Sequence, residues 1–499
     1  MKSTVKDQSR SGRWRPLGSI NPSVYCFGNL PRGLAREIDD AVSYACRFNA
    51  EVARPIFLEH DLKTFEDPEY LPWELMEKAN SWGFYTMFIP KAYGGKGVSM
   101  YTMPYVMEEL ASVCVGLANV IGVHYLGLLG FWGALNGTIA SRVAGEVIKG
   151  ERSGKPCLVS LAITEPGAGT DVEDSDLKDK ARLGCLARRV EGGYVVNGSK
   201  VFISNGHVST WCCLITWEQG KIPSESQIMF ALKTGTKGFS FGRHEDKMGQ
   251  RICPASELVF DDCFISDEYV LIDNSYTEGL PRKAMGEHSL HVALGMSRAA
   301  VGAFGTGVAR GAYEDALDFA MKTSIAGKRL IDQEWAQGLL AQMYMNVMLG
   351  RLCYSECLYA DFASRGLASK MLQKNIYYFL KLMPVLILRT LSTPFFTSPK
   401  FPKVVAEVMA KNVKSSSAYY TSGFGSIAKI IGTDMGVKNS HLALDLMGQA
   451  GIRSDRGTEK RLRDAKLLQI YEGTNQLNQI NLFNCLIARK LPGVKVFED

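Results

Sequence analysis

The 499-residue sequence lacks several features that would assign it to a class at once. It has no low-complexity tract and no run of five or six like charges, which disfavours disorder and a nucleic-acid-binding arm. Its twelve cysteines form no CxxC pair and no regular spacing with histidine, which disfavours a metal site or a disulfide framework. Lys and Arg outnumber Asp and Glu only by 57 to 51, a weak preference for small anionic ligands.

The N-terminal segment also lacks an apolar core, so a secretory signal peptide is not expected there. Residues 1–19 are basic and poor in acids. Gly12, Pro16 and Gly18 would interrupt the amphipathic helix of a mitochondrial transit peptide. We therefore expect a cytoplasmic protein with reduced, mostly buried thiols, and keep the mitochondrial matrix as the alternative location.

The composition is that of a globular protein, with 46% hydrophobic and 22% charged residues. About two to four domains are expected at this length. Residues 30–156 carry apolar residues at helical spacing, residues 157–275 contain short strand patterns, and helical spacing returns over 276–499. The predicted fold class is therefore α+β, with a helical N-terminal domain, a middle β-domain and a helical C-terminal domain.

Local patterns add detail to the last two segments. Asn197-Gly198 lies between two apolar runs and predicts a hairpin turn. Residues 227–233 and 256–265 are predicted strands. Four glycines in the C-terminal segment lower its helix propensity: Gly302, Gly305, Gly307 and Gly311. Close contact between helices is the usual compensation for such glycines, so we expect it here.

The most apolar stretch is IYYFLKLMPVLILRTLSTPFF at 376–396. Lys381, Pro384 and Arg389 interrupt it, so it falls short of the ~20 residues of a spanning helix. Two interpretations stay open. It forms a buried helical hairpin or an oligomer contact, or it forms an amphipathic patch that lies on a membrane or on a partner protein.

Four segments carry patterns typical of a binding site. LAITEPGAGTD at 161–171 is a glycine-rich turn whose backbone N–H groups can hold a phosphate or a flat ring. It lacks the GxGxxG of a Rossmann site and the GK[ST] of a Walker loop. NGSKVFISNG (197–206), KMG (247–249) and IYEGTNQ (470–476) follow.

These four segments, in this order, resemble the acyl-CoA dehydrogenase family. The resemblance runs from about Glu59 to Arg489 and includes PKAYGG, VMEEL and RDAK. It implies a helical N-terminal domain, a middle β-domain and a C-terminal four-helix bundle. It also implies non-covalent FAD, an acyl-CoA thioester substrate, electron transfer flavoprotein as acceptor, and a homotetramer. The implied role is fatty acid or acyl-CoA metabolism such as β-oxidation.

The implied reaction is α,β-dehydrogenation to the enoyl-CoA. A base removes the α-proton while the β-hydrogen leaves as hydride to flavin N5. The resemblance assigns the base to Glu472, and burial of such a carboxylate would raise its pKa toward the working pH. A second position for the base in the family falls on Ser297, which cannot act as a base. Both observations favour Glu472.

The resemblance also assigns the ligand contacts. The implied substrate contacts are Thr170, Arg298 and Gly473. Phe202 and Ser204 stand where the family has Trp-Ile-Thr, and core packing is the other interpretation of Phe202. The implied FAD contacts come from several segments: Leu161, Thr164, Gly169, Thr170, Phe202, Ser204, Gly448, Thr474 and Gln476. No metal ligand is assigned.

Some positions depart from the family pattern. Thr323 stands where the family has an arginine, Glu334 where it has a glutamine, and Gln449 where it has a glycine. These positions bear on FAD contacts made across subunits, so we expect a homodimer or a homotetramer. An insertion at about 367–415 splits the C-terminal bundle and contains the apolar stretch.

Two alternatives use the same fold for other purposes. An oxidase, a monooxygenase or a nitroalkane-type flavoenzyme is disfavoured by the retained glutamate in YEGT. A non-catalytic flavin-binding scaffold on nucleic acid would need a basic face, and the sequence has no basic cluster beyond pairs such as Arg188-Arg189.

Overall fold

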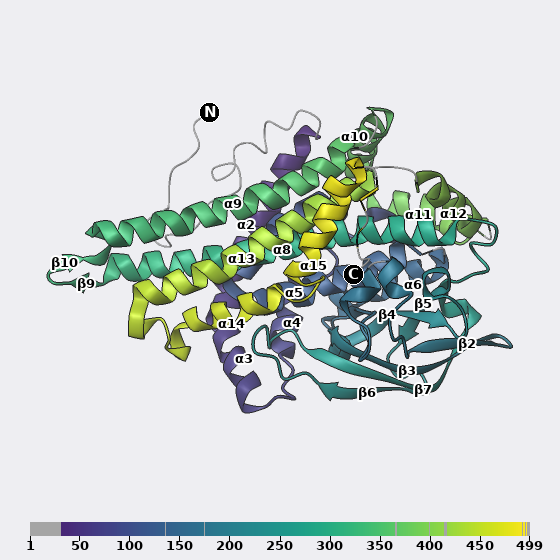
Figure 1. The fold of residues 1–499 in the computed structure, drawn as a ribbon, viewed down its shortest axis with the longest axis horizontal. Coiled ribbons are helices and arrows are strands. Elements are labelled where there is room, and N and C mark those ends of the chain that lie inside the picture. Colours follow the sequence, from purple (N-terminus) through teal and green to yellow (C-terminus); the bar gives the residue numbers. More distant parts are fainter. Residues whose placement is uncertain are drawn as a thin grey trace.

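A computed structural model describes residues 31–134, 136–173, 175–364, 367–398, 400–413, 417–491, 493–494 and 496. Within these ranges the chain forms helices, then an eight-stranded sheet, then helices again. Figure 1 shows the long C-terminal helices stacked above the sheet, with the N-terminal helices packed beneath and beside them. The predicted α+β class and three-domain architecture are confirmed.

The N-terminal domain is built from helices that end before the sheet begins. α6 starts at an asparagine cap, where Asn136 Oδ1 accepts from Ile139 N at 3.2 Å, and it ends at Gly154 in the left-handed region. α5 is bent at Cys114, whose φ of −144° is not helical. The helices are α2 Arg32–Phe48, α3 Arg54–Glu66, α4 Trp73–Ser81, α5 Met103–Trp132 and α6 Gly137–Ser153.

The middle domain is one mixed sheet with the order β6-β7-β3-β2-β4-β5-β8, and β1 pairs in parallel with β4. The strands predicted at 227–233 and 256–265 are confirmed as β5 and β7. The strands are β1 Leu158–Ala162, β2 Leu186–Val190, β3 Gly193–Ser204, β4 Ser209–Glu218, β5 Gln227–Lys233, β6 Phe239–His244, β7 Ala255–Ser266 and β8 Val270–Ile272.

The predicted hairpin at Asn197-Gly198 is wrong. Both residues lie inside the continuous strand β3, where the pairing with β7 shifts register between Val196 and Gly198. The Asn197 side chain donates to Asp262 Oδ1 at 3.0 Å and accepts from Asp262 N at 2.8 Å. Gly198 has φ +120°, and a Cβ there would overlap the backbone of Gly184. The dipeptide therefore forms a bulge that fits a close neighbour.

The C-terminal domain consists of long helices joined by shorter ones. α14 and α15 lie along α13 in Figure 1, and a short hairpin of β9 and β10 links α8 to α9. The elements are α8 Arg282–Lys322, β9 Ser324–Ile325, β10 Lys328–Arg329, α9 Glu334–Ser364, α10 Leu367–Leu382, α11 Val385–Phe396, α12 Phe401–Asn412, α13 Ser417–Met447, α14 Thr458–Leu468 and α15 Asn475–Leu482, besides the short α7 Ser175–Lys178 in the middle domain.

The glycines of α8 allow it to approach α13 and α5 backbone to backbone. A Cβ on Gly302 would overlap the backbone of Ala428, and one on Gly305 the backbone of Gly432. On another side of α8, a Cβ on Gly307 would meet the carbonyl oxygen of Glu108 at 2.5 Å. The predicted close contact between helices is confirmed.

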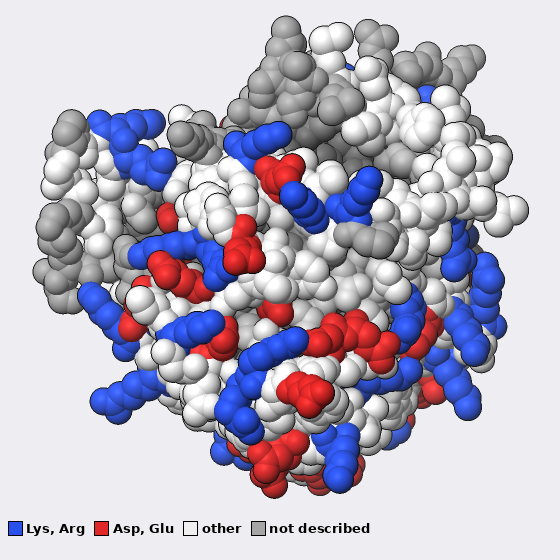
Figure 2. Space-filling model, turned by 90° about the vertical axis from the view of Figure 1, so that its right-hand side faces the viewer, with Lys and Arg blue, Asp and Glu red and all other residues white. Residues whose placement is uncertain are grey.

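The apolar stretch at 376–396 is exposed in the single chain. It spans α10 and α11, and Leu382 and Leu386 beside the bend between them are 82% and 77% exposed. Figure 2 views the side on which α11 and α12 lie, and its upper right shows a broad white area with few charged residues, while red and blue mix below. Burial of this stretch as a hairpin within the chain is therefore wrong, whereas an oligomer contact and a patch that lies on a membrane or a partner protein stay predictions.

Two other helical stretches are long and apolar enough to cross a bilayer, Met100–Trp132 and Arg282–Lys322. The apolar windows of these stretches are 72% and 67% buried within the protein. They belong to α5 and α8, whose side chains form the core. Unlike the exposed stretch at 376–396, these two helices are apolar because most of their side chains pack inside the protein.

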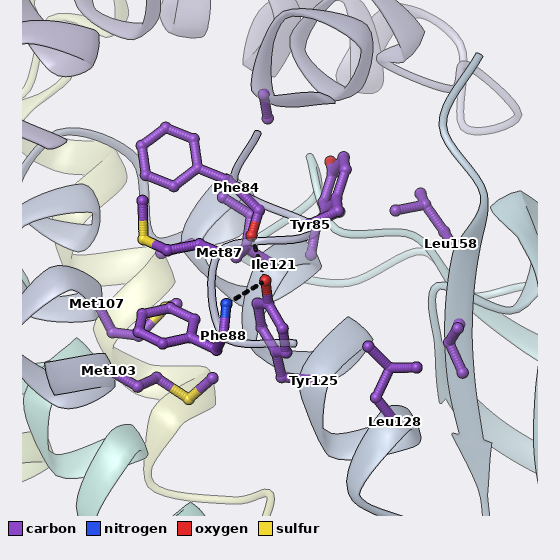
Figure 3. Close-up of a cluster of buried hydrophobic side chains, with 14 of the residues drawn as sticks. Phe84, Tyr85, Met87, Phe88, Met103, Met107, Ile121, Tyr125, Leu128 and Leu158 are labelled. Carbon is purple, nitrogen blue, oxygen red and sulfur yellow. Dashed lines mark hydrogen bonds between the residues drawn. The ribbon is translucent and has the colours of Figure 1, made fainter. Parts of the chain in front are cut away.

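One core joins the N-terminal helices to the sheet. Figure 3 shows Tyr125 of α5 among the aromatic and sulfur-containing side chains of this cluster, with Leu158 of β1 on its other side. The Tyr125 hydroxyl accepts from Phe88 N at 3.1 Å and donates to Phe84 O at 2.6 Å. The first strand is therefore fixed against α5, and the loop after β1 has a defined position.

The glycine contact between α8 and α13 generates a stability prediction. In Gly305→Ala the new methyl group would overlap the backbone of Gly432, which cannot rotate away, so we expect a loss of about 1–3 kcal/mol. The matched control is Gly286→Ala in the same helix, where a Cβ meets nothing within 4 Å. That variant should gain up to about 1 kcal/mol from helix propensity. Urea unfolding measures the free energy of unfolding of both variants. Equal changes in the two variants would contradict the close contact between α8 and α13.

Candidate active site

The loop after β1 and the strand β3 form one unit. Val201 N donates to Thr164 O at 3.0 Å, and Lys200 Nζ donates to Ile163 O at 2.9 Å. The same ammonium group pairs with Glu165 at 2.7 Å, and both side chains are almost fully buried. A buried and fully paired charge of this kind holds two segments in one relative position. Two of the sequence motifs are thus locked together.

Phe202 projects its ring from the surface of the β-domain. It lies at the second register shift between β3 and β7, its φ is +58°, and it is 60% exposed. A left-handed backbone is uncommon for a bulky residue and costs about 1–3 kcal/mol. The interpretation of Phe202 as a core residue is therefore wrong. Its strained backbone and exposed ring are typical of a ligand-binding position.

The KMG segment connects the β-domain to the C-terminal motifs. Gln250, next in the chain, donates from Nε2 to Asp464 O at 2.9 Å, and its Oε1 accepts from the Tyr471 hydroxyl at 3.2 Å. Lys247 Nζ donates to Gln250 O at 3.0 Å. A Cβ on Gly249 would overlap the backbone of Arg463. The motifs at 247–249, 463–466 and 470–476 therefore meet in space.

Glu472 lies in the loop between α14 and α15 and has a left-handed backbone, with φ +58°. The Ser297 hydroxyl of α8 donates to Glu472 Oε2 at 2.7 Å. Burial raises the pKa of the Glu472 carboxyl, while the Ser297 hydrogen bond and the charges of Arg298 and Lys429 oppose the rise. The carboxylate is thus a stronger base than an exposed one.

Two buried cations hold the backbone of this loop. Arg298 Nε donates to Glu472 O at 3.2 Å, and Lys429 Nζ donates to Gly473 O at 2.7 Å. Asn478 Nδ2 also donates to Gly473 O, at 2.8 Å. Burial, together with the charge of Arg298, lowers the pKa of Lys429 to about 7. These contacts fix the strained conformation that directs Glu472 toward Ser297.

A second carboxylate, Glu173, lies against the same loop. Arg298 Nη2 donates to Glu173 Oε2 at 2.9 Å, and the Glu173 side chain is 15% exposed. Burial raises the pKa of Glu173 to about 7 against the attraction of Arg298, and the charge of Glu472 adds to the rise. A Cβ on Gly473 would come within 2.6 Å of Glu173 Oε2, and Gly473 has φ +75°. Glycine is therefore required beside this carboxylate.

The sequence analysis missed Glu173, Lys429 and Asn478. Glu173 lies two residues after GTD of the first motif, and Lys429 is a lone charge in the apolar run GFGSIAKIIG. A charge inside an apolar helical run is a signal that could have drawn attention to Lys429. Nothing in the sequence around Asn478 distinguishes it from a surface amide.

The structure places most of the other predicted site residues around the same region. Leu161 is half-buried in β1, and Thr164, Gly169 and Thr170 lie in or just after the loop that follows it. At the start of α15, Thr474 Oγ1 caps the helix by accepting from Leu477 N at 3.3 Å. Gln476 in the first turn of that helix is exposed.

Gly448 is the exception. It follows the C-terminal end of α13, nineteen residues beyond Lys429, which is about 28 Å along a helix. Within one chain it therefore lies apart from Glu472, and its contact with FAD stays a prediction. Thr323 and Glu334 lie at the same end of the helices, at the end of α8 and the start of α9.

The residues present fit a cofactor with a flat ring and phosphates. Phe202 offers an exposed ring. A Cβ on Gly169 would meet nothing nearer than 3.9 Å, so there is open space at the glycine-rich turn. Thr164 and Ser204 are half-buried hydroxyls on either side of these two features along the chain. Such a set can hold FAD, the cofactor implied by the sequence resemblance.

Three models of protein-family domains match the chain. They are described as the N-terminal, middle and C-terminal domains of acyl-CoA dehydrogenase. The N-terminal model matches residues 37–133 and the middle model residues 160–263. The C-terminal model matches 285–367 and 405–484, so it passes over residues 368–404.

Individual relatives give the same picture. Cyclohex-1-ene-1-carbonyl-CoA dehydrogenase of Syntrophus aciditrophicus is 26% identical over 400 residues, which cover 80% of this chain and 78% of the relative. The structure of butyryl-CoA dehydrogenase from Megasphaera elsdenii matches with a TM-score of 0.68 and 23% identity, over 90% of this chain and 98% of that one. A structure from work on the electron transferring flavoprotein of Acidaminococcus fermentans matches with a TM-score of 0.69, 21% identity and the same two coverages.

The environment of Glu173 generates a spectroscopic prediction. Because its pKa is raised to about 7, a buried protonated carboxyl should give an infrared carbonyl band at pH 6 that fades as the pH rises through 7. The band should be missing in Glu173→Gln. The matched control is Glu278→Gln at an exposed position, which should keep it. An unchanged band in Glu173→Gln would show that Arg298 keeps Glu173 ionised.

Proposed function

This chain belongs to the acyl-CoA dehydrogenase family, whose members depend on FAD, and we propose that it oxidises an acyl-CoA thioester to the enoyl-CoA with Glu472 as the base. The observation that supports this most strongly is the environment of Glu472. It is a half-buried carboxyl with a raised pKa, on a loop that two distant segments, α8 and α13, hold in place.

The hydrogen bond from Ser297 gives the two carboxylate oxygens of Glu472 different roles. Ser297 occupies Oε2, which leaves Oε1 to accept the α-proton of the substrate. The rise in pKa caused by burial makes Glu472 a stronger base than an exposed carboxylate, because proton transfer is most efficient when the pKa lies near the working pH. Arg298 and Lys429 keep the loop rigid through its carbonyl oxygens, so the carboxylate keeps its direction.

The thioester carbonyl needs hydrogen-bond donors, because negative charge develops on its oxygen as the α-proton leaves. A backbone N–H beside the base can supply one, and Glu472 N lies in the loop that Arg298 and Lys429 fix. Gly473 permits close approach of the substrate, since a side chain there would collide with Glu173. Thr170 and Arg298 are the proposed contacts of the CoA portion.

FAD, when bound, accepts the hydride that leaves the β-carbon. We propose that Phe202 covers one face of its ring and that Ser204 offers a hydroxyl to it. Thr164, Gly169 and Thr170 would hold the cofactor from the first motif, and Leu161 from the strand before it. Thr474 and Gln476 would contact it from α15. The exposed ring of Phe202 and the open space at Gly169 support this assignment.

Electron transfer flavoprotein is the proposed acceptor, and a homodimer or homotetramer is the proposed assembly. Met345, Leu349 and Leu352 form an apolar stripe on α9 and are 62%, 43% and 50% exposed. Such a stripe supports self-association through α9. The place of Gly448, far from Glu472 in its own chain, also supports an assembly in which it serves the FAD of a neighbouring subunit.

The first experimental test is an anaerobic titration of the flavin-loaded protein with a panel of straight-chain, branched and cyclic acyl-CoAs. One class should bleach the flavin absorbance band in the parent. In Glu472→Gln the rate of bleaching should fall by about 10²–10⁴-fold, because the α-proton has no base. The exposed Glu278→Gln serves as the control and should behave as the parent.

Two results would contradict the proposal. If no thioester bleaches the band in the parent, the flavin serves another reaction. If the reduced band returns rapidly in air without an added acceptor, the protein is an oxidase on the same fold. In either case a slower reaction of Glu472→Gln would no longer be evidence for a dehydrogenase.

Ser297 generates a prediction for the pH profile. Its hydroxyl lowers the pKa of Glu472, so Ser297→Ala should raise that pKa further. The base is active when deprotonated, and therefore the acid limb of kcat/KM against pH should move to higher pH. Ser224→Ala, which removes an exposed serine bonded to Asp179, is the control and should leave the limb in place. A limb that moves to lower pH in Ser297→Ala would contradict the assignment.

A further inference from the structure

Helices α10, α11 and α12 carry an unusual concentration of exposed apolar side chains. On α10 and α11, those around and after the bend are Phe379, Leu382, Leu386, Ile387, Leu391 and Phe395, at 51%, 82%, 77%, 48%, 63% and 51% exposure. Val404 and Val408 of α12 are 45% and 52% exposed. We call this set the apolar face. Clusters of this size on a folded protein mark a surface that is covered in use.

The body of the protein holds this face in position. Lys91 Nζ, in the PKAYGG turn, donates to Lys381 O at 3.1 Å and Met383 O at 3.2 Å, which fixes the bend between α10 and α11. The Tyr93 ring stacks on Phe396 with centroids 4.6 Å apart. The two helices are therefore anchored on their inner side, and the apolar face points outward.

The geometry of the helices excludes a simple membrane span. α10 has 16 residues and α11 has 12, both shorter than the ~20 needed to cross a bilayer. The pair Lys374–Leu382 and Val385–Phe396 is bent by 119°. Helices with apolar residues on one side and this length can lie in the plane of a bilayer surface.

The charge of this region is concentrated and of one sign. From the start of α10 to the end of α12 the sequence has seven Lys and Arg residues and one acidic residue, Glu407. That excess of +6 equals the formal net charge of the whole chain, so the rest of the molecule is neutral on balance. The exposed members are Lys381, Arg389, Lys400, Lys403 and Lys411.

We propose that the apolar face, with its surrounding basic residues, docks the protein on an anionic phospholipid bilayer. The apolar side chains would enter the boundary between headgroups and acyl chains, and the lysines would lie at the level of the lipid phosphates. Each Lys or Arg near an anionic surface strengthens binding, and buried apolar area adds to it. An anionic bilayer satisfies both features of the region at once.

A second copy of the chain is a poorer occupant. A two-fold contact would place the same surface of each copy together, and two surfaces of +6 would repel. The apolar stripe on α9 offers a self-contact without that excess charge, because its exposed positions Met345, Leu349 and Leu352 are uncharged. The C-terminal family model also passes over residues 368–404, so most of the apolar face is additional to what the model describes.

Vesicle flotation of the full-length protein tests the proposal. Vesicles of phosphatidylcholine alone are compared with vesicles that also contain phosphatidylserine. The protein should float with the anionic vesicles at low salt, and much less with neutral vesicles or at about 0.5 M salt. Leu382→Ser combined with Leu386→Ser should reduce binding by about tenfold or more, and Lys400→Glu combined with Lys403→Glu should do so only on anionic vesicles.

The matched control combines Ile222→Ser and Ile452→Ser, which remove exposed apolar residues elsewhere, at 57% and 66% exposure. This control should bind vesicles as the parent does. Thermal unfolding of each variant shows that the fold is kept, since all the altered side chains are exposed.

Three outcomes would overturn the proposal. In the first, the parent fails to float with anionic vesicles at low salt. In the second, the control variant loses binding as strongly as the Leu382 and Leu386 variant. In the third, the parent does not bind vesicles and the Leu382 and Leu386 variant changes the sedimentation coefficient, which would assign the face to contact between copies.

Discussion

The backbone-to-backbone contact of α8 with α13 is the constraint on which the site depends. Gly302 and Gly305 allow the two helices to touch without intervening side chains. The turns that face each other then carry Ser297 and Arg298 on one helix and Lys429 on the other. Because the helices are so close, these polar groups converge on a single loop, and each finds a hydrogen-bond partner in it. A wider spacing would remove the carbonyl partners that Arg298 and Lys429 have in the loop, and a lost hydrogen bond of a buried cation costs more than a glycine's loss of helix propensity.

Arg298 and Lys429 affect both the conformation of the loop that carries Glu472 and the pKa of its carboxyl. Arg298 and Lys429 bind carbonyl oxygens of the strained loop, so they stabilise a backbone conformation that its own sequence disfavours at Glu472. Their positive charge also limits how far burial can raise the pKa of the Glu472 carboxyl. Position and basicity of one carboxylate are thus set by the same two side chains. Glu173, which accepts from Arg298, links this arrangement to the glycine-rich loop.

Much of this could be predicted from the sequence, where spacing or a motif reports directly on structure. The strands β5 and β7, the order of the domains, the close packing of α8 and the family followed in this way. The Asn197-Gly198 hairpin did not, because a local turn signal was overridden by pairing of β3 along the whole of β7. The contact of Glu173 with Arg298 spans 125 residues and that of Lys429 with Gly473 spans 44, and no local pattern encodes them. The position of Gly448 depends on helix length, which a family motif does not convey.

The partners of Glu472 come from segments far apart in the chain, with Ser297 lying 175 residues before it. Contacts of such long sequence separation form late in folding, since the chain entropy lost in closing the loops has to be recovered by other interactions first. An intermediate with a formed β-domain and separate helices would therefore hold the glycine-rich loop without an oriented carboxylate. Catalytic competence would appear only with the final docking of α8, α13 and the 470–476 loop, so recovered activity would report the last step of refolding.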